Sequence, residues 1–377
     1  MKNIAIGISL VAGFTILTSL VWLYRGDYYV EHRQAPRFRP AVEPRQMCDL
    51  KLFFEPITDA DPDPDGKSGM YRWPHMIRKE FLRFPQFIAD SAEKADFVIL
   101  PVMHHLHRYL CDEKDEDCDE NARQHTWDVL GNIDIKPWHI IMFSLDAGRC
   151  NKMDPKLRAH TAAAIHMQAL GDDRQSRWDC FRRGRDVIVP PYTDPDVELH
   201  DAADEARERD VHLFFAGTVR GGGYSLGTRE FVWKHFRHEP GFVILKHHMK
   251  RPDYVKMLHR AKFALHVPGN EYWSPRLTEA VVAGAVPVVV GDHSVLPFDG
   301  DALDWKQFSI RIPERDLDRL PDILTAIPPW QLKRMQQAAA EAAPLLQYHR
   351  RLPYALAYSL CRIREQTKTV QNYRNGT

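Results

Sequence analysis

The stretch that decides the fold, residues 260–297, reads RAKFALHVPGNEYWSPRLTEAVVAGAVPVVVGDHSVLP. Two short apolar runs in it, residues 262–267 and 286–290, end in Pro-Gly and Gly-Asp, which is typical of buried parallel strands. Between them, Ser274 is suited to cap a helix, and Pro275 to its first turn, where the missing N–H is not needed. The stretch therefore predicts a strand, a loop, a helix and a second strand.

The start of this helix predicts an anion site. Free N–H groups with the helix dipole behind them suit a diphosphate, and Arg276 adds a permanent cation to the same turn. Glu279 follows three residues later on the same helix face. We expect Ser274 and Arg276 to bind the diphosphate of a nucleotide sugar, and Glu279 its ribose hydroxyls. The same spacing also fits a solvated surface ion pair.

The N-terminus predicts a membrane anchor. Residues 4–24, IAIGISLVAGFTILTSLVWLY, carry no charge and match the roughly 20 residues that cross a bilayer core. No small-residue cleavage site follows, which favours an uncleaved signal anchor over a signal peptide. The arginines after this segment favour, by the positive-inside rule alone, the opposite topology to a lumenal domain.

Composition limits the classes of partner. The 377 residues are enough for two domains, and 51 basic against 51 acidic residues give no global field for nucleic acid. The six cysteines form an even set, so lumenal disulfides are expected, but the fifteen pairings stay open.

Strand-like and helix-like segments alternate from residue 50 onward, which predicts an α/β fold of two facing Rossmann-like lobes. In the first half we expect strands over 51–55, 96–101 and 139–144, helices over 74–83 and 158–170, and a linker over 194–209. In the second half we expect strands over 211–216, 242–246, 262–267 and 286–291, with helices over 228–236, 253–260 and 275–283 between them, and then helices over 316–327, 330–343 and 348–368.

An ordered set of motifs resembles the exostosin-like glycosyltransferases. It comprises FFAG at 214–217, SPR at 274–276, GAVPV at 284–288, LPF at 296–298, DWKQF at 304–308 and, in the first half, ADFVILP at 95–101 and CFRRGRDVIVPPY at 180–192. The resemblance covers residues 96–335. It implies a type II Golgi membrane protein of glycosyltransferase-B fold with a lumenal domain. It also implies transfer of a sugar, with inversion, from a nucleotide-diphosphate donor to a polysaccharide or glycoprotein glycan.

The resulting organisation is a cytoplasmic tail (1–3), a transmembrane signal anchor (4–24), a stem (25–49), an N-terminal acceptor lobe (50–205), a C-terminal nucleotide-sugar-binding lobe (206–345) and a C-terminal helix with tail (346–377). A UDP-sugar is the expected donor and co-substrate. Homo- or hetero-oligomers are left open.

The catalytic base is expected in the first lobe, across the cleft from the donor. Asp146 and His105 follow predicted strands and are our candidates, although a structural role fits either one alone. Second-tier donor contacts are Arg220, Arg229 and Lys246, since ligands gather at the carboxyl ends of parallel strands.

We expect no metal in the chemical step. The Asp-x-Asp pairs beginning at Asp59, Asp63 and Asp299 read as turn residues, and the histidine clusters 104–107 and 247–248 are weak metal signals. Two other functions remain open: a fucosyltransferase-type enzyme that uses a GDP-sugar, because residues 279–291 also resemble that group, and a catalytically silent glycan-binding or chaperone-like partner.

Overall fold

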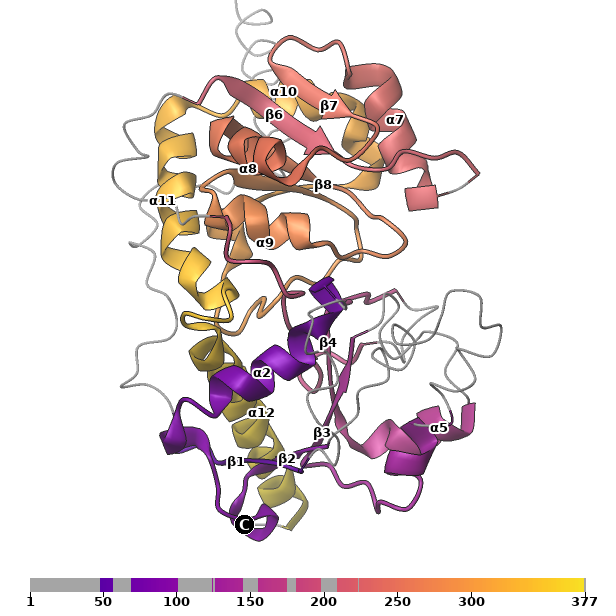
Figure 1. The fold of residues 1–377 in the computed structure, drawn as a ribbon, viewed down its shortest axis with the longest axis vertical. Coiled ribbons are helices and arrows are strands. Elements are labelled where there is room, and N and C mark those ends of the chain that lie inside the picture. The colour runs from indigo at the N-terminus through magenta and orange to yellow at the C-terminus, as the bar shows by residue number, and fades with distance from the viewer. Residues whose placement is uncertain are drawn as a thin grey trace, which may run out of the picture.

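The computed structural model describes residues 48–56, 69–100, 124, 126–144, 155–174, 181–197, 209–222 and 224–375. In these ranges the chain forms two lobes, one above the other in Figure 1, each built on a parallel sheet covered by helices. The expected α/β architecture of two lobes is confirmed for the described residues. The predicted anchor, residues 4–24, lies outside it, and no described helix is long and apolar enough to cross a bilayer.

The sheet of the N-terminal lobe has its described strands in chain order, β1-β2-β3-β4-β5, all parallel. The strands are β1 (Leu52–Phe54), β2 (Phe97–Ile99), β3 (His139–Phe143), β4 (Ile165–Gln168) and β5 (Val187–Ile188), and the α-helices of this lobe include α2 (Trp73–Phe81) and α5 (Pro155–His160). The three predicted strands and the helix predicted over 74–83 are confirmed.

The helix predicted over 158–170 is wrong in its second half. After α5 and the 3-10 turn Thr161–Ala163, the chain enters β4, whose four residues are buried between β3 and β5. The backbone N–H of His166 donates to Asp186 at 2.9 Å, and Arg182 donates to the same carboxylate at 2.6 Å. Alanine-rich sequence favours a helix locally, but burial and pairing in the sheet outweigh that preference.

The sheet of the C-terminal lobe runs β10-β9-β8-β6-β7 and is also parallel in the described residues. Its elements are β6 (Val211–Ala216), α7 (Thr228–Phe236), β7 (Phe242–Leu245), α8 (Arg251–Arg260), β8 (Ala261–His266), α9 (Pro275–Val282), β9 (Val286–Val290), β10 (Ile310–Ile312), α10 (Leu320–Thr325) and α11 (Pro329–Leu346). The alternation predicted over 211–291 is confirmed, whereas the three-residue strand β10 was not predicted.

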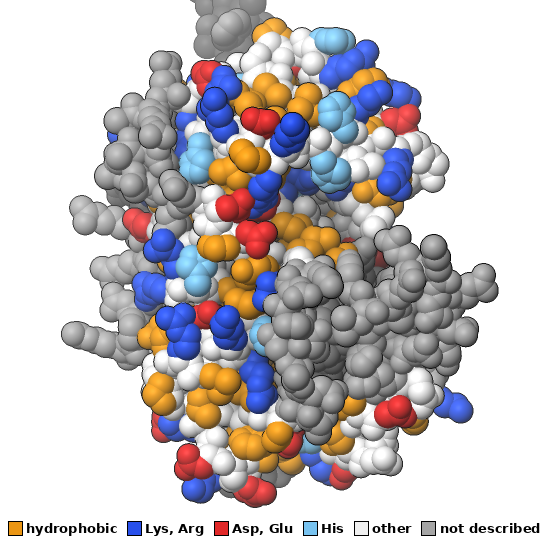
Figure 2. All heavy atoms as spheres, in the orientation of Figure 1, with side chains coloured by type: hydrophobic (Ala, Val, Ile, Leu, Met, Phe, Trp, Pro, Cys, Tyr) orange, Lys and Arg blue, Asp and Glu red, His pale blue; other side chains and the backbone are white. Residues whose placement is uncertain are grey.

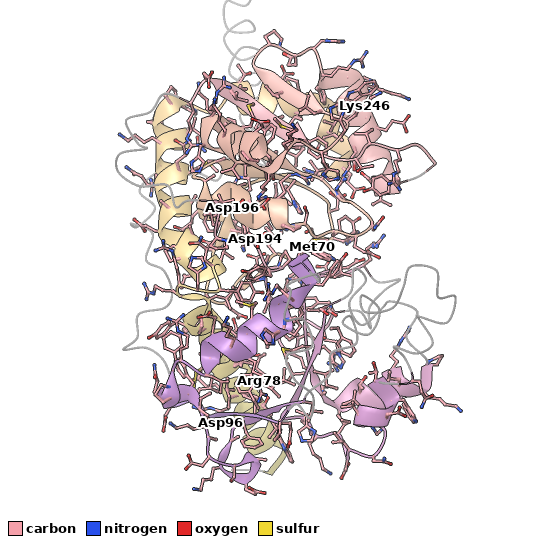
Figure 3. The ribbon with its side chains drawn as sticks, in the orientation of Figure 1. Met70, Arg78, Asp96, Asp194, Asp196 and Lys246 are labelled. Atoms are coloured by element: carbon pink, nitrogen blue, oxygen red, sulfur yellow. A yellow bond between two sulfur atoms is a disulfide. The ribbon has the colours of Figure 1, made fainter. Side chains whose placement is uncertain are left out.

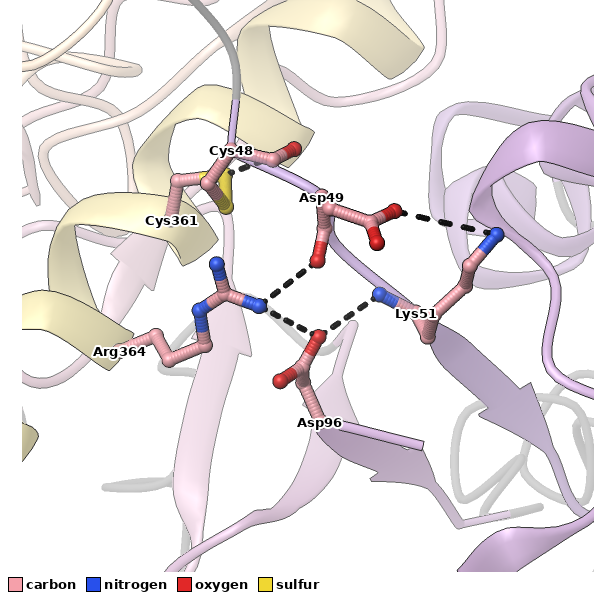
Figure 4. Close-up of a disulfide and its surroundings, with 6 residues drawn as sticks. All are labelled: Cys48, Asp49, Lys51, Asp96, Cys361 and Arg364. Carbon is pink, nitrogen blue, oxygen red and sulfur yellow. Dashed lines mark hydrogen bonds and ion pairs between the residues drawn. A yellow bond between two sulfur atoms is a disulfide. The ribbon is translucent and has the colours of Figure 1, made fainter. Parts of the chain in front are cut away.

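The last helix joins the lobes. α12 (Leu352–Asn375) leaves the C-terminal lobe and lies beside α2 in the N-terminal lobe (Figure 1). A disulfide between Cys48 and Cys361 ties it to the start of the described chain, which settles one of the open pairings. Next to that bond, Arg364 donates to Asp96 at 2.7 Å and to the backbone oxygen of Asp49 at 2.8 Å (Figure 4).

A close backbone contact holds the two lobes together, between the segment that follows β4 and the segment that follows β9. The N–H of Val295 donates to the oxygen of Gly171 at 2.8 Å, and Asp172 forms an isolated bridge with Ser294. A Cβ at Gly171 would come within 2.3 Å of the Val295 oxygen, so this approach requires glycine. The two lobes therefore meet along one edge of the cleft described next.

Candidate functional site

A cavity of about 420 Å³ lies between the lobes, around the start of α9. The N-terminal lobe contributes Met70 and Tyr71, and the described lining from the C-terminal lobe comprises Ala216, Thr218, Tyr224, Arg229, His248, Met249, Arg251, Tyr254, Gly269, Asn270, Glu271, Trp273, Ser274, Pro275, Arg276 and Glu279. Figure 2 shows acidic, basic and hydrophobic side chains side by side where the lobes meet. A volume of this size suits a ligand of several rings.

The start of α9 has the geometry that the sequence predicts. Ser274 is the N-cap, with extended backbone, and its Oγ accepts from the backbone N–H of Arg276 at 3.3 Å. Pro275 lies in the first turn. The positive end of the α9 dipole therefore lies at the cavity, where an anion binds favourably.

Two buried arginines lie beside this helix start. Arg276 donates to the backbone oxygen of Ala216 at 2.9 Å and lies over the ring of Phe215, while its Nε has no partner in the described residues. Arg229 donates to the backbone oxygens of Pro268 and Thr218 at 2.8 and 3.1 Å.

Among the described residues no carboxylate forms an ion pair with either of these guanidiniums. Burial, and then the charge of Arg276, lower the pKa of Arg229 to about 10. Two like charges held together without a counterion are costly, and a bound anion would offset that cost. This end of the cavity therefore suits an anion.

The other end of the cavity carries paired charges. Glu279 is buried and accepts from Arg251 at 2.6 Å and from the hydroxyl of Tyr254 at 2.9 Å. Arg251 also donates twice to Asp196, at 2.6 and 2.7 Å. Burial and the neighbouring Glu279 raise the pKa of Tyr254 well above its ordinary value. The surface pair between Arg276 and Glu279 is not formed, because Glu279 binds Arg251 instead.

Aromatic side chains close the cavity between the lobes. Tyr71, from the turn before α2, meets Trp273, which precedes the cap of α9, edge to face with ring centroids 5.8 Å apart. Figure 3 places Met70, the residue before Tyr71, at the upper end of α2, facing the C-terminal lobe. Both lobes therefore line the same space.

Four of the six predicted donor contacts line this cavity: Ser274, Arg276, Glu279 and Arg229. Arg220 is exposed over the ring of Tyr224 and is not among the lining residues. Lys246 is also outside the lining; it lies over Trp233, at 5.0 Å, in the outer part of the C-terminal lobe (Figure 3).

The two candidate bases, Asp146 and His105, lie outside the described residues, so their roles stay predictions. The same holds for the Asp-x-Asp pairs that begin at Asp59 and Asp63. Asp299 and Asp301 lie in turns, where they pair with Arg311 of β10 and Arg362 of α12. The described residues include no group of three or more side chains able to hold a metal ion.

The lining residues that were not predicted from the sequence include three polar ones, His248, Arg251 and Tyr254. His248 lies in the loop after β7 and Arg251 at the start of α8, and their position after a parallel strand was a usable signal. In the sequence, His248 stands out only as part of the weak metal signal at 247–248. The Nε2 of His248 lies 3.1 Å from the hydroxyl of Thr218, in the loop after β6.

Comparison with known proteins identifies the family of this chain. The profile of the Exostosin GT47 domain matches residues 33–327. A "Probable beta-1,4-xylosyltransferase" of Arabidopsis thaliana is 36% identical over 168 residues, which cover 43% of this chain and 40% of that protein. A "Probable glucuronosyltransferase" of Oryza sativa subsp. japonica is 37% identical over 177 residues, 45% of this chain and 41% of that protein. The match thus spans about two fifths of the relatives' length.

Two solved structures overlap with most of the chain at low identity. WaaG, a glycosyltransferase of lipopolysaccharide biosynthesis, shares 15% identity at a TM-score of 0.40, covering 82% of this chain and 98% of its own. Anabaena HepE, solved with UDP and glucose, shares 9% identity at a TM-score of 0.38, covering 86% and 100%.

Proposed function

The chain belongs to the exostosin GT47 family, and from this premise we propose that it is a glycosyltransferase that uses a nucleotide-diphosphate sugar. The observation that carries the proposal is the pair of buried arginines, Arg229 and Arg276, which lie without a carboxylate partner among the described residues beside the capped start of α9. The two guanidiniums, with the positive end of the α9 dipole, match the charge and the hydrogen-bond acceptors of a diphosphate.

The proposed reaction is a displacement with inversion. An acceptor hydroxyl forms a bond to the anomeric carbon and loses its proton to a base, while the bond from that carbon to the diphosphate oxygen breaks and its electron pair stays on the diphosphate. Arg276 and Arg229 stabilise the charge that grows on the leaving group. Glu279, held by Arg251 and Tyr254, accepts from the ribose hydroxyls with its remaining lone pairs. Asp146 and His105 remain the proposed sources of the base.

The plant relatives are named as a xylosyltransferase and a glucuronosyltransferase, which supports transfer of a xylosyl or glucuronosyl group. We propose that the donor is a UDP-sugar and the acceptor a polysaccharide or glycoprotein glycan. We propose further that residues 4–24 anchor the chain in the Golgi membrane with the two lobes in the lumen, and that the chemical step needs no metal. A GDP-sugar donor remains the second candidate, because residues 279–291 also resemble the fucosyltransferase type.

Binding and transfer assays on the full-length chain in detergent test this function. UDP-xylose, UDP-glucuronic acid and GDP-fucose are titrated by calorimetry, and transfer is measured on xylan oligosaccharides. We expect binding of a UDP-sugar that Arg276→Ala abolishes, while Arg315→Ala, at an exposed site, leaves it unchanged. A preference for GDP-fucose would overturn the choice of donor, and a folded protein that binds none of the three would favour the silent partner.

A further inference from the structure

His248 lies in the cavity at the end that holds the unpaired arginines. Its Nε2 is 3.1 Å from the hydroxyl of Thr218, and the backbone oxygen of Thr218 accepts from Arg229 at 3.1 Å. The histidine and Arg229 are therefore held by the same residue, at the anion site rather than at the paired end of the cavity.

The charges that act on His248 come from each element around it, and all are cationic. They are Arg276 of α9, Arg229 of α7 and, in its protonated form only, its own neighbour His247 in the loop after β7. Partial burial, followed by these charges, lowers the pKa of His248, so the imidazole is neutral in the empty cavity at neutral pH. Thr218, on the loop after β6, contributes a neutral hydroxyl.

A diphosphate in this position would offset this positive field. Its two negative charges would balance those of Arg276 and Arg229, and a nearby negative charge favours the protonated form of the imidazole. An imidazolium has two N–H donors, so one can remain on Thr218 while the other turns to a phosphate oxygen. A group that is neutral without ligand and charged with it couples donor binding to pH.

We propose that His248 is a third ligand of the donor diphosphate, which takes up a proton from solvent when a nucleotide sugar binds. This inference rests on the proposed function, since it needs a diphosphate between Arg229 and Arg276. In the reaction the leaving diphosphate gains negative charge, so the protonated imidazole binds the departing group more strongly than the intact donor. His248 thereby acts on the leaving group as a charge-neutralising residue.

Calorimetry of UDP-xylose binding to the full-length chain tests the inference. Both phosphates of this probe are esterified, so neither titrates near neutral pH as the terminal group of UDP does. Titrations at one pH in two buffers of different ionisation enthalpy give the number of protons taken up. The arginines stay protonated in this range, so His248 is the group expected to supply the signal.

We expect the wild type to take up a fraction of a proton at pH 6.5 and to bind more weakly as pH rises through the pKa of the bound state. If that pKa lies one unit above the free one, the affinity falls about tenfold. His248→Gln should take up no proton and bind with a constant affinity. His238→Gln changes an exposed histidine of the same lobe outside the lining; it is the matched control and should behave as the wild type.

Two outcomes separate this inference from the proposed function. Wild-type binding without proton uptake, or uptake that persists in His248→Gln, would overturn the role of His248 while leaving the donor site intact. Absence of UDP-xylose binding at every pH, in a protein that remains folded by circular dichroism, would overturn the UDP-sugar site and the inference with it.

Discussion

The two ends of the cavity hold the same kind of side chain in opposite states. At one end, Arg276 and Arg229 are buried with no carboxylate beside them in the described chain. At the other end, Arg251 forms ion pairs with Asp196 and Glu279. The charge of a paired arginine contributes to the folded structure before any ligand arrives, whereas the charge of an unpaired one contributes only when an anion binds.

This difference indicates which arginines bind the ligand and which stabilise the folded protein. The unpaired end should govern binding with little effect on stability, and the paired end should govern stability and the position of Glu279. Arginine-to-methionine changes suit the comparison because they keep most of the side-chain volume and remove only the charge and its donors.

Arg276→Met should give the largest effect. Removing the charge that faces the diphosphate lowers the transfer rate by about 100-fold or more, as expected for one group that stabilises the charge of a transition state. The free energy of unfolding should change little, because the wild-type charge is buried without a counterion in the described residues. Transfer assays and urea unfolding measure the two quantities. A large loss of stability with unchanged transfer would contradict the comparison.

Arg251→Met should show the opposite pattern. Glu279, which is buried, and Asp196 would both lose their cation, and the half-exposed position of Arg251 reduces the cost to about 1–3 kcal/mol of unfolding free energy. Urea unfolding at 10 °C checks this value. If Arg251→Met proved more stable than Arg276→Met, the assignment of the paired end to structure would be wrong.

The sequence predicts the unpaired end better than the paired one. Ser274, Pro275 and Arg276 are neighbours, so cap, first turn and cation appear as one local pattern between two apolar strands. Arg251 is 28 residues from Glu279 and 55 from Asp196, and no local pattern encodes a pair at such separation. The helices and strands, too, are predicted best where a local pattern determines them.

The C-terminal lobe alternates strands and helices with short connections, and its predicted elements match the structure over 211–291. In the N-terminal lobe, the identity of β4 depends on partners far along the chain: Ile165 pairs with Ile140 of β3, and Met167 with Val187 of β5. Its own sequence reads as a helix, and only these tertiary contacts make it a strand. The base stays the least defined part of the site, because both candidates lie outside the described residues.

Tyr254→Phe should lower the free energy of unfolding by less than Arg251→Met does, because it changes a single contact at the paired end. It removes the one hydroxyl that donates to Glu279 at 2.9 Å and leaves the ring and the bond from Arg251 in place. Loss of a buried hydrogen bond to a carboxylate should lower the free energy of unfolding by about 1 kcal/mol. Tyr358→Phe, on α12 and away from the cavity, is the control. Equal stability of Tyr254→Phe and wild type would show that this hydroxyl does not hold Glu279.

Asp196→Asn should give the smallest effect, and one that depends on pH. The hydrogen bonds from Arg251 lower the pKa of Asp196 in the folded protein. A lowered folded-state pKa stabilises the protein above the unfolded value of about 3.9, and this contribution is lost as pH falls through the folded value.

The wild type should therefore be more stable than Asp196→Asn at pH 6, and the difference should shrink toward zero below pH about 4. Other carboxylates titrate equally in both proteins, so urea unfolding of the two across this range isolates the paired end. Asp253 is an exposed carboxylate on α8, the helix that begins with Arg251. The stability of Asp253→Asn relative to the wild type should not change in this way with pH. If the difference in unfolding free energy stayed constant from pH 6 to pH 3, Asp196→Asn would destabilise the protein through poorer packing and not through the lost charge. Arg251 would then hold Glu279 without help from Asp196.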